Sequence, residues 1–176
     1  MKNSKKIIAI VSLIIIVGVL FFQIINHSGP FKGNHTGTKD KKSMDRVHVD
    51  RVVDGDTFVA HDQQHHKLKV RLIGVDTPET VKPHTAVQPY GKKASNYSKS
   101  HLTNKNVYLE YDQEKHDQYG RTLAYVWMDK KNMYNQELIE KGLAREKYYA
   151  PNNKYRSLLE KEERHAQQKN INIWAS

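Results

Sequence analysis

Two short segments of the chain place carboxylates and an arginine around tight turns, close together in the sequence. The first is Asp54-Gly55-Asp56-Thr57, and the second runs from Arg71 to Thr80 and contains Asp76-Thr77-Pro78-Glu79. Two aspartates and a backbone carbonyl can supply the oxygen ligands that a hard cation such as Ca²⁺ prefers, while leaving positions for water and a phosphate. This combination suits metal-assisted attack on a phosphodiester, with Glu79 and Arg71 available for the chemistry.

Each of these segments also fits a purely structural role. An Asp-Gly pair between apolar residues is a favoured hairpin turn, and Asp76-Thr77-Pro78-Glu79 can form a turn whose side-chain oxygens bond to local backbone N–H groups. A third segment, Asp117-Gln118-Tyr119-Gly120-Arg121, favours the catalytic interpretation over the structural one. Its arginine enters a new predicted strand, where it can face the same phosphate as Arg71.

With these segments the chain resembles the thermonuclease, or staphylococcal nuclease-like, family from about Val47 to Trp174. The matching motifs follow the family's order and spacing, and such agreement over separate motifs is highly specific. They are Asp-Gly-Asp-Thr at 54–57, Arg71, Val-Asp-Thr-Pro-Glu-Thr at 75–80, Tyr-Gly-Arg at 119–121, Leu123-Ala124-Tyr125, Lys141-Gly142-Leu143-Ala144, Pro151-Asn152-Asn153 and Asn172-Ile173-Trp174.

The resemblance implies an α+β, mainly β, fold: a five-stranded OB-fold barrel packed with three helices. It implies a Ca²⁺-dependent, sugar-non-specific endonuclease that hydrolyses DNA and RNA to products with 3′-phosphates. The residues that match the family's site are Asp56, Asp76 and the Thr77 carbonyl as metal ligands, Arg71, Glu79 and Arg121 as catalytic residues, and Tyr119 with Tyr148 or Tyr149 as substrate-binding residues.

The chain departs from the best-known family pattern in three places near this site. The segment 144–151 is one residue shorter, which leaves Tyr148 and Tyr149 as alternatives for one substrate-binding position. Gln118 stands where that pattern has a lysine, and the loop at 82–85 carries fewer lysines. Both losses predict a weaker electrostatic hold on flanking phosphates, without touching the reaction centre.

Composition limits the classes of protein that remain. The chain has 176 residues, of which 38% are hydrophobic, enough for one domain plus an appendage. It has no cysteine, so disulfides and thiolate metal sites are excluded. The formal net charge of +10 is divided equally between residues 1–45 and the remainder, so the domain itself is only moderately basic, which is compatible with a polyanionic substrate.

Three lysines, Lys2, Lys5 and Lys6, precede an uncharged apolar run from Ile7 to Ile25. Such a run rises about 28 Å as a helix, close to the hydrocarbon thickness of a bilayer. We therefore predict a signal-anchor or transmembrane segment at 1–25, a flexible stem at 26–45 and the folded domain at 46–176. The lysines predict that the domain is extracytoplasmic, anchored by this span or secreted after its cleavage, although no Ala-x-Ala-like site is evident.

Hydrophobic periodicity predicts strands first and helices later. In the third strand Leu68, Val70 and Leu72 alternate with Lys69 and Arg71, so Arg71 is expected on the opposite face. A helix near Tyr90 to Leu102 carries a stripe at Ala94, Tyr97 and His101. The predicted strands are 46–53, 57–61, 67–73, 106–111 and 121–127, and two further helices are predicted at 135–142, ending at Gly142, and from a Pro151-Asn152-Asn153 cap to about 168.

Two alternatives of other classes remain open at this point. One is a catalytically silent OB-fold nucleic-acid-binding module displayed at the membrane, and the other is a membrane-anchored structural protein that uses Ca²⁺ for rigidity. The first predicts the loss of a reactive residue, and the second has no use for two arginines at the site. His65-His66 has no metal-ligand partner at convincing spacing, so we interpret it as a solvated turn. DNA and RNA are the predicted partners of a monomeric catalytic domain, with no obligate protein partner.

Overall fold

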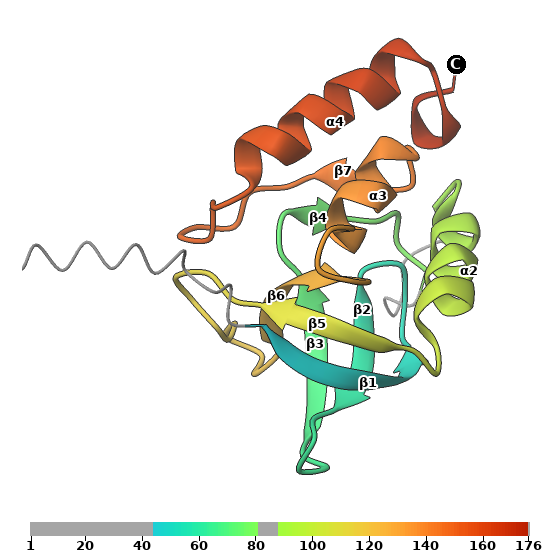
Figure 1. Cartoon of the computed structure of the whole chain (residues 1–176). Helices are drawn as coiled ribbons and strands as arrows, with labels where there is room; N and C mark the ends of the chain where they lie inside the picture. The colour runs from blue at the N-terminus through green and yellow to red at the C-terminus, as the bar shows by residue number, and fades with distance from the viewer. Residues whose placement is uncertain (1–43, 81–87, 176) are drawn as a thin grey trace, which may run out of the picture. The chain divides into compact units, whose positions relative to one another are not determined.

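The computed structural model describes residues 44–80 and 88–175. Within these ranges five strands form a closed barrel in the order β1-β2-β3-β6-β5, with β5 pairing back onto β1 (Figure 1). A separate two-stranded sheet joins β4 (Val75–Asp76) to β7 (Arg145–Glu146). The barrel strands are β1 (Asp45–Val52), β2 (Thr57–His61), β3 (Lys67–Leu72), β5 (Asn106–Glu110) and β6 (Thr122–Trp127).

The first three strands form the meander that their turns predict. β1 pairs antiparallel with β2, and β2 with β3, so that Thr57 lies opposite Arg71. β3 then pairs in parallel with β6, and this pairing sets Arg71 opposite Leu123. The predicted alternation holds in β3, because Val70 and Leu72 are buried in the hydrophobic core while Arg71 lines a polar cavity.

Three helices complete the fold, as the resemblance implies. They are α2 (Gly91–Leu102), which packs on β1, α3 (Tyr134–Glu140), which packs on β6, and α4 (Arg156–Gln168), which packs on α3 and β7. A single 3₁₀ turn follows at Asn172–Trp174. Gly142 comes just after α3 with φ of 60°, and a Cβ there would lie 2.5 Å from the carbonyl oxygen of Ile171. This position therefore requires glycine, as predicted.

The structure corrects the predicted face of α2. Tyr97 and His101 are only partly buried, and the fully buried side instead includes Ala94, Ser95 and Ser98. A serine can face the interior here because its hydroxyl is fully used: Ser98 Oγ donates to the Gly55 carbonyl at 2.6 Å and accepts from the Tyr134 hydroxyl at 2.9 Å. Burial of a hydroxyl is tolerated when its hydrogen bonds are satisfied.

The predicted cap of α4 is wrong. The residue that precedes the helix is Tyr155, and it makes no capping hydrogen bond through its side chain. Asn152 is buried and bonds instead to the backbone of Glu114, accepting from its N–H at 2.8 Å and donating to its carbonyl at 3.0 Å. The amide therefore fastens two loops together rather than starting a helix.

The predicted membrane span at 1–25 and stem at 26–45 fall almost entirely outside the described ranges. Among the helices at 44–80 and 88–175, none has the length and apolar character needed to cross a bilayer.

Candidate active site

One cavity gathers nearly all of the side chains that the sequence motifs singled out. Its volume is about 560 Å³, and it lies where β3 ends and the chain passes into β4. Eight of the predicted site residues line it, and Tyr148 does not. The lining residues are Asp54, Asp56, Thr57, Arg71, Asp76, Thr77, Pro78, Glu79, Gln88, Tyr119, Arg121, Lys147 and Tyr149.

The turn between β1 and β2 is built to bring its aspartates close to Thr77. The N–H groups of Val53 and Asp54 both donate to the Thr57 carbonyl, which closes the turn. At its tip, a Cβ on Gly55 would lie 2.6 Å from Cγ2 of Thr77, so no larger residue fits without displacing that threonine. Close approach of the two segments therefore requires glycine at this position.

Asp56 is the most heavily bonded carboxylate of the cavity. It is 6% exposed, and its Oδ2 accepts from the Thr77 N–H at 2.9 Å and the Thr77 hydroxyl at 3.0 Å. Its Oδ1 accepts from the Thr57 hydroxyl at 3.0 Å. Neighbouring Asp54 is affected in turn, since burial and the Asp56 charge raise the pKa of Asp54 to about 6.

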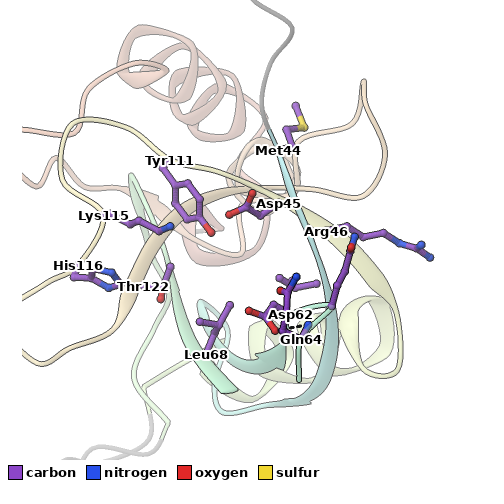
Figure 2. A pocket seen from close by; sticks show the side chains of 12 residues that line it. Met44, Asp45, Arg46, Asp62, Gln64, Leu68, Tyr111, Lys115, His116 and Thr122 are labelled. Atoms are coloured by element: carbon purple, nitrogen blue, oxygen red, sulfur yellow. Dashed lines mark hydrogen bonds between the residues drawn. The ribbon is translucent and has the colours of Figure 1, made fainter. Parts of the chain in front are cut away.

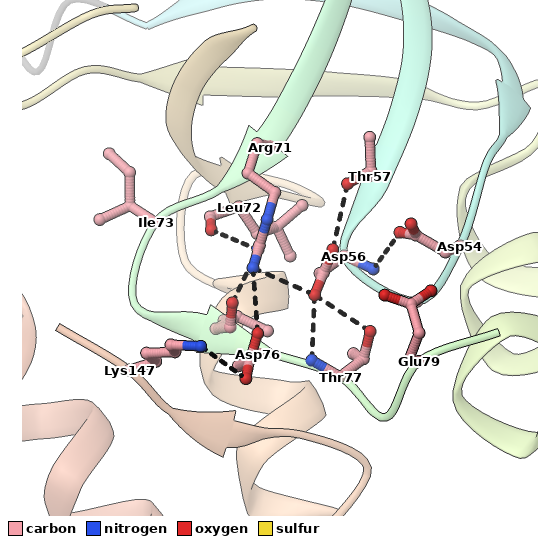
Figure 3. A network of polar contacts seen from close by, with 12 residues as sticks. Asp54, Asp56, Thr57, Arg71, Leu72, Ile73, Asp76, Thr77, Glu79 and Lys147 are labelled. Atoms are coloured by element: carbon pink, nitrogen blue, oxygen red, sulfur yellow. Dashed lines mark hydrogen bonds and ion pairs between the residues drawn. The ribbon is translucent and has the colours of Figure 1, made fainter. Parts of the chain in front are cut away.

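Arg71 is held rigidly among these carboxylates (Figure 3). Its side chain is buried, and Nη1 donates to the carbonyls of Leu72 at 3.0 Å and Val75 at 2.7 Å. Its Nη2 lies 3.3 Å from Oδ2 of Asp56 and 3.5 Å from Oδ1 of Asp76. The guanidinium thus arrives at the cavity already oriented, because two backbone carbonyls fix its plane.

Asp76 and Lys147 meet through the small β4–β7 sheet. The pairing places Asp76 opposite Arg145, and Lys147 follows β7 directly. The ammonium nitrogen of Lys147 lies 3.2 Å from Oδ2 of Asp76, as Figure 3 shows. Both side chains are partly exposed to the cavity, so this ion pair can be exchanged for other partners.

Arg121 reaches the same cavity from the segment before β6. Its Nε donates to Oδ2 of Asp117 at 2.6 Å, and its N–H donates to Oδ1 at 2.9 Å. Burial disfavours the charged form of Asp117, but these hydrogen bonds and that from the Tyr119 N–H outweigh it and lower the pKa of the Asp117 carboxyl. Asp117 is therefore a constant anion that orients Arg121.

The structure separates the two adjacent tyrosines. Tyr149 lines the cavity, with the guanidinium carbon of Arg71 5.8 Å from its ring centroid. Tyr148 lies outside it, with Arg156 4.4 Å over its ring. Tyr119 is 74% exposed at the cavity edge, and the guanidinium carbon of Arg121 lies 5.4 Å from its ring centroid. Two aromatic faces thus flank the carboxylates and arginines.

The donor set of this cavity fits a hard divalent cation. Both Asp56 and Asp76 lie within 3.5 Å of Nη2 of Arg71, so their carboxylates converge. Over the ranges that the structure covers, no group of three or more histidines, aspartates and glutamates is arranged as a ready-made metal cluster. The two aspartates and the Thr77 carbonyl of the predicted ligand set would make a smaller, all-oxygen site that leaves positions for water and phosphate.

A second cavity, of about 450 Å³, lies at the start of β1 (Figure 2). It also contains acids and bases, including Asp45, Asp62 and Lys115. Asp62 accepts hydrogen bonds from the N–H groups of Gln64 and His66, and the Lys115 ammonium lies 4.0 Å from the centroid of the Tyr111 ring. His66 Nδ1 also pairs with Asp62 at 3.0 Å, so the predicted solvated turn uses this histidine locally.

Sequence reasoning missed four contributors to the candidate site. They are Lys147, Gln88, the orienting role of Asp117 and the link from Ser98 to the Asp-Gly turn. Gln88 Oε1 accepts from the Glu79 N–H at 2.9 Å and so fixes the segment that carries the glutamate. Only Asp117 carried a local signal, because an aspartate before a Tyr-Gly pair is typical of a turn that bonds its own backbone.

Comparison with known proteins agrees with this geometry. The family model described as staphylococcal nuclease homologue matches residues 69–176. The chain is 53% identical over 171 residues to a thermonuclease of Staphylococcus intermedius, covering 97% of this chain and 98% of that protein. It is 46% identical over 175 residues to a thermonuclease of Staphylococcus hyicus, covering 99% of each. It is 40% identical over 141 residues to endonuclease YncB of Bacillus subtilis, covering 78% of this chain and 65% of that protein.

Proposed function

Because this chain belongs to the staphylococcal nuclease homologue family, we propose that it is a Ca²⁺-dependent endonuclease that hydrolyses both DNA and RNA and leaves 3′-phosphates. Its membership and its thermonuclease relatives make it a nuclease. The observation that carries the finer proposal is the convergence of Asp56, Arg71 and Asp76, two of them buried, in one cavity with Glu79 and Arg121.

The cation would be held by the carboxylates of Asp56 and Asp76 and by the backbone carbonyl of Thr77. When bound, Ca²⁺ neutralises charge at the phosphate and lowers the pKa of water nearby. The protein prepares this set by fixing Asp56 with two hydrogen bonds from Thr77. These bonds link the Asp-Gly-Asp turn to the residue that would supply the carbonyl ligand.

Glu79 is proposed to hold the attacking water in line with the phosphorus. Its position is set from both sides, since its N–H donates to Gln88 and its Oε1 accepts from the Thr80 N–H at 2.9 Å. A carboxylate that accepts a hydrogen bond from water orients one lone pair of that water toward the phosphorus. As the water oxygen bonds to phosphorus, the bond from phosphorus to the 5′ oxygen breaks. The water gives up one proton and the departing 5′ oxygen takes one up, so the products are a 3′-phosphate and a 5′-hydroxyl.

Arg71 and Arg121 are proposed to stabilise the extra negative charge of the pentacoordinate transition state. Each guanidinium is oriented before substrate arrives, Arg71 by two carbonyls and Arg121 by Asp117. Preorganised donors contribute more to the transition state than to the ground state, because the charge that they meet grows during the reaction. Tyr119 and Tyr149, which line the cavity, are proposed to pack against the nucleotide.

The direct test is digestion of plasmid DNA and of a structured RNA by the purified protein, in Ca²⁺ and in excess chelator. We expect cleavage of both only with Ca²⁺, and fragments that a kinase labels without prior phosphatase treatment, because their 5′ ends are hydroxyls. Cleavage that persists in chelator, or fragments with 5′-phosphates, would contradict the proposal. Binding without cleavage would favour the silent nucleic-acid-binding module instead.

We further propose that the domain is displayed outside the cytoplasm, either on the membrane or after release, and acts as a monomer. The support is in the sequence, where lysines precede the apolar run Ile7–Ile25 and a polar stem follows it. Protease added to intact cells should release an active fragment whose first residue lies in the stem. Full-length protein that resists protease until the cells are lysed would refute this orientation.

A further inference from the structure

Lys147 is a cation of the candidate site that the mechanism above does not use. Its backbone N–H donates to the Gly74 carbonyl at 3.4 Å, and this bond extends the pairing of β7 with β4 by one residue. The backbone on both strands therefore sets where the side chain begins, and its ammonium reaches Asp76. Strand pairing therefore fixes this lysine next to a proposed metal ligand, so its position in the cavity is set by the fold.

The charge of the cavity depends on this lysine. Among the lining residues that the structure describes, four carboxylates oppose Arg71, Arg121 and Lys147, which leaves a formal charge of −1. A divalent cation changes that charge to +1, whereas without Lys147 the loaded cavity would be neutral. Since an internal phosphodiester carries one negative charge, Lys147 supplies the excess positive charge that attracts it.

Both arginines already donate hydrogen bonds to protein groups, whereas Lys147 is freer to change its partner. Arg71 is bonded to two carbonyls and faces two aspartates, and Arg121 is bonded to Asp117. The Lys147 side chain is 50% exposed, and its ammonium lies 5.5 Å from the ring centroid of Tyr149. An ammonium with three donors on a flexible stem can exchange one oxygen partner for another.

We propose that Lys147 is a substrate-binding residue that pairs with Asp76 in the unloaded protein and with a nucleic-acid phosphate in the loaded one. This inference rests on the proposed function. A cation held by Asp76 competes with the lysine for the same carboxylate, and a phosphate oxygen bound nearby offers the lysine a new acceptor. Lys147 therefore opposes metal binding slightly and favours substrate binding.

The test compares Lys147→Gln, Lys147→Arg and the control Lys130→Gln, in full-length protein purified in detergent. Lys130 is an exposed lysine of the β6–α3 loop and does not line the cavity. Binding of a fluorescent, phosphorothioate-linked hexathymidylate is measured by anisotropy in saturating Ca²⁺ over a range of salt. Binding of Ca²⁺ alone is measured by calorimetry.

We expect Lys147→Gln to weaken oligonucleotide binding about five- to tenfold and to reduce the salt slope of log K by about 0.7, the value for one phosphate contact on a single strand. Its Ca²⁺ affinity should be unchanged or slightly higher, because a competitor for Asp76 is gone. Lys147→Arg should restore oligonucleotide binding, and Lys130→Gln should resemble the wild type.

Two results would overturn this role for Lys147 while leaving the nuclease intact. One is oligonucleotide binding by Lys147→Gln equal to that of the Lys130→Gln control. The other is a parallel loss of Ca²⁺ and oligonucleotide affinity, which would mean that the lysine only supports the structure of the site. A wild-type protein that neither binds nor cleaves nucleic acid would instead overturn the proposed function, and this inference with it.

Discussion

The candidate active-site cavity and the second cavity contain similar kinds of side chain, yet the two differ in how firmly those side chains are held. Their volumes are comparable, about 560 and 450 Å³, and each is lined by aspartates, a lysine and a tyrosine. In the second cavity Lys115 is exposed, and Asp62 uses its oxygens to close its own turn. In the active-site cavity Asp56 and Arg71 are buried and oriented by several bonds each.

This difference in burial and bonding distinguishes a cavity suited to catalysis from a cavity that is merely lined by polar groups. An ion pair between neighbouring groups in a water-exposed loop contributes little to stability. Its two charges are used on each other and have little effect on any third group. Groups that are fixed, partly removed from water and turned toward one shared volume act strongly on whatever enters it, because the local dielectric is lower and no reorganisation is needed.

The largest effect is expected from removing the groups that are proposed to act on the transition state. Glu79→Gln and Arg121→Ala should each lower kcat about 10²- to 10³-fold, as loss of one preorganised group does elsewhere, while oligonucleotide affinity falls much less. Single-turnover cleavage and anisotropy measure the two quantities separately. Wild-type turnover in Glu79→Gln would remove this residue from the mechanism.

A smaller but still large effect is expected from the proposed metal ligands. Asp56→Ala and Asp76→Ala should both weaken Ca²⁺ binding and activity together. Asp56→Ala should also lower the free energy of unfolding by about 1–3 kcal/mol, because it leaves the part-buried N–H and hydroxyl of Thr77 without their acceptor. Asp76 is more exposed, so its variant should be the more stable of the two.

Calorimetry with Ca²⁺ and thermal denaturation in chelator distinguish the two aspartates. Unchanged Ca²⁺ affinity in either variant would exclude that residue from the metal site. Equal stabilities of the two variants would contradict the structural role assigned to Asp56.

The spacing between the two metal-binding segments can be changed without touching any ligand. Gly55→Ala places a methyl group against Thr77, and overpacking of this kind costs about 1–3 kcal/mol. Because the Thr77 carbonyl is a proposed ligand, Ca²⁺ affinity should fall together with stability. A destabilised Gly55→Ala protein with wild-type Ca²⁺ affinity would show that the position of Thr77 does not control metal binding.

The smallest effect is expected in the second cavity. Lys115→Gln removes a cation over the Tyr111 ring, an exposed contact worth about 0.5–1 kcal/mol. Activity and Ca²⁺ affinity should stay within about twofold of the wild type, since this lysine acts on no reacting group. A tenfold loss of turnover in this variant would mean that the second cavity takes part in the reaction and that the comparison is wrong.

The five strands and three helices could be predicted from the sequence because the signals for them are local, whereas closure of the strands into a barrel followed only from the family resemblance. Alternating apolar residues define a strand within six residues, and Asp-Gly or a terminal glycine defines where an element stops. The motif residues could be placed for the same reason. Asp54 to Thr57 and Asp117 to Arg121 each lie on one tight turn, and Asp76 to Glu79 follow one another directly from the end of β4, so the chain itself limits how far apart the residues of each segment can lie.

Contacts between segments far apart in the sequence could be seen only in the folded structure. The serines of α2 weaken the sequence prediction of a helix. Ser98 is nevertheless buried, because its hydroxyl donates a hydrogen bond to the Gly55 carbonyl, 43 residues away. The sequence predicted that Asn152 caps a helix, but its side-chain amide accepts a hydrogen bond from the backbone of Glu114 instead. Tyr149 rather than Tyr148 enters the cavity, and Lys147 reaches Asp76, because β7 pairs with β4. Local patterns determine which element a residue joins, but burial and pairing between elements determine what its side chain meets.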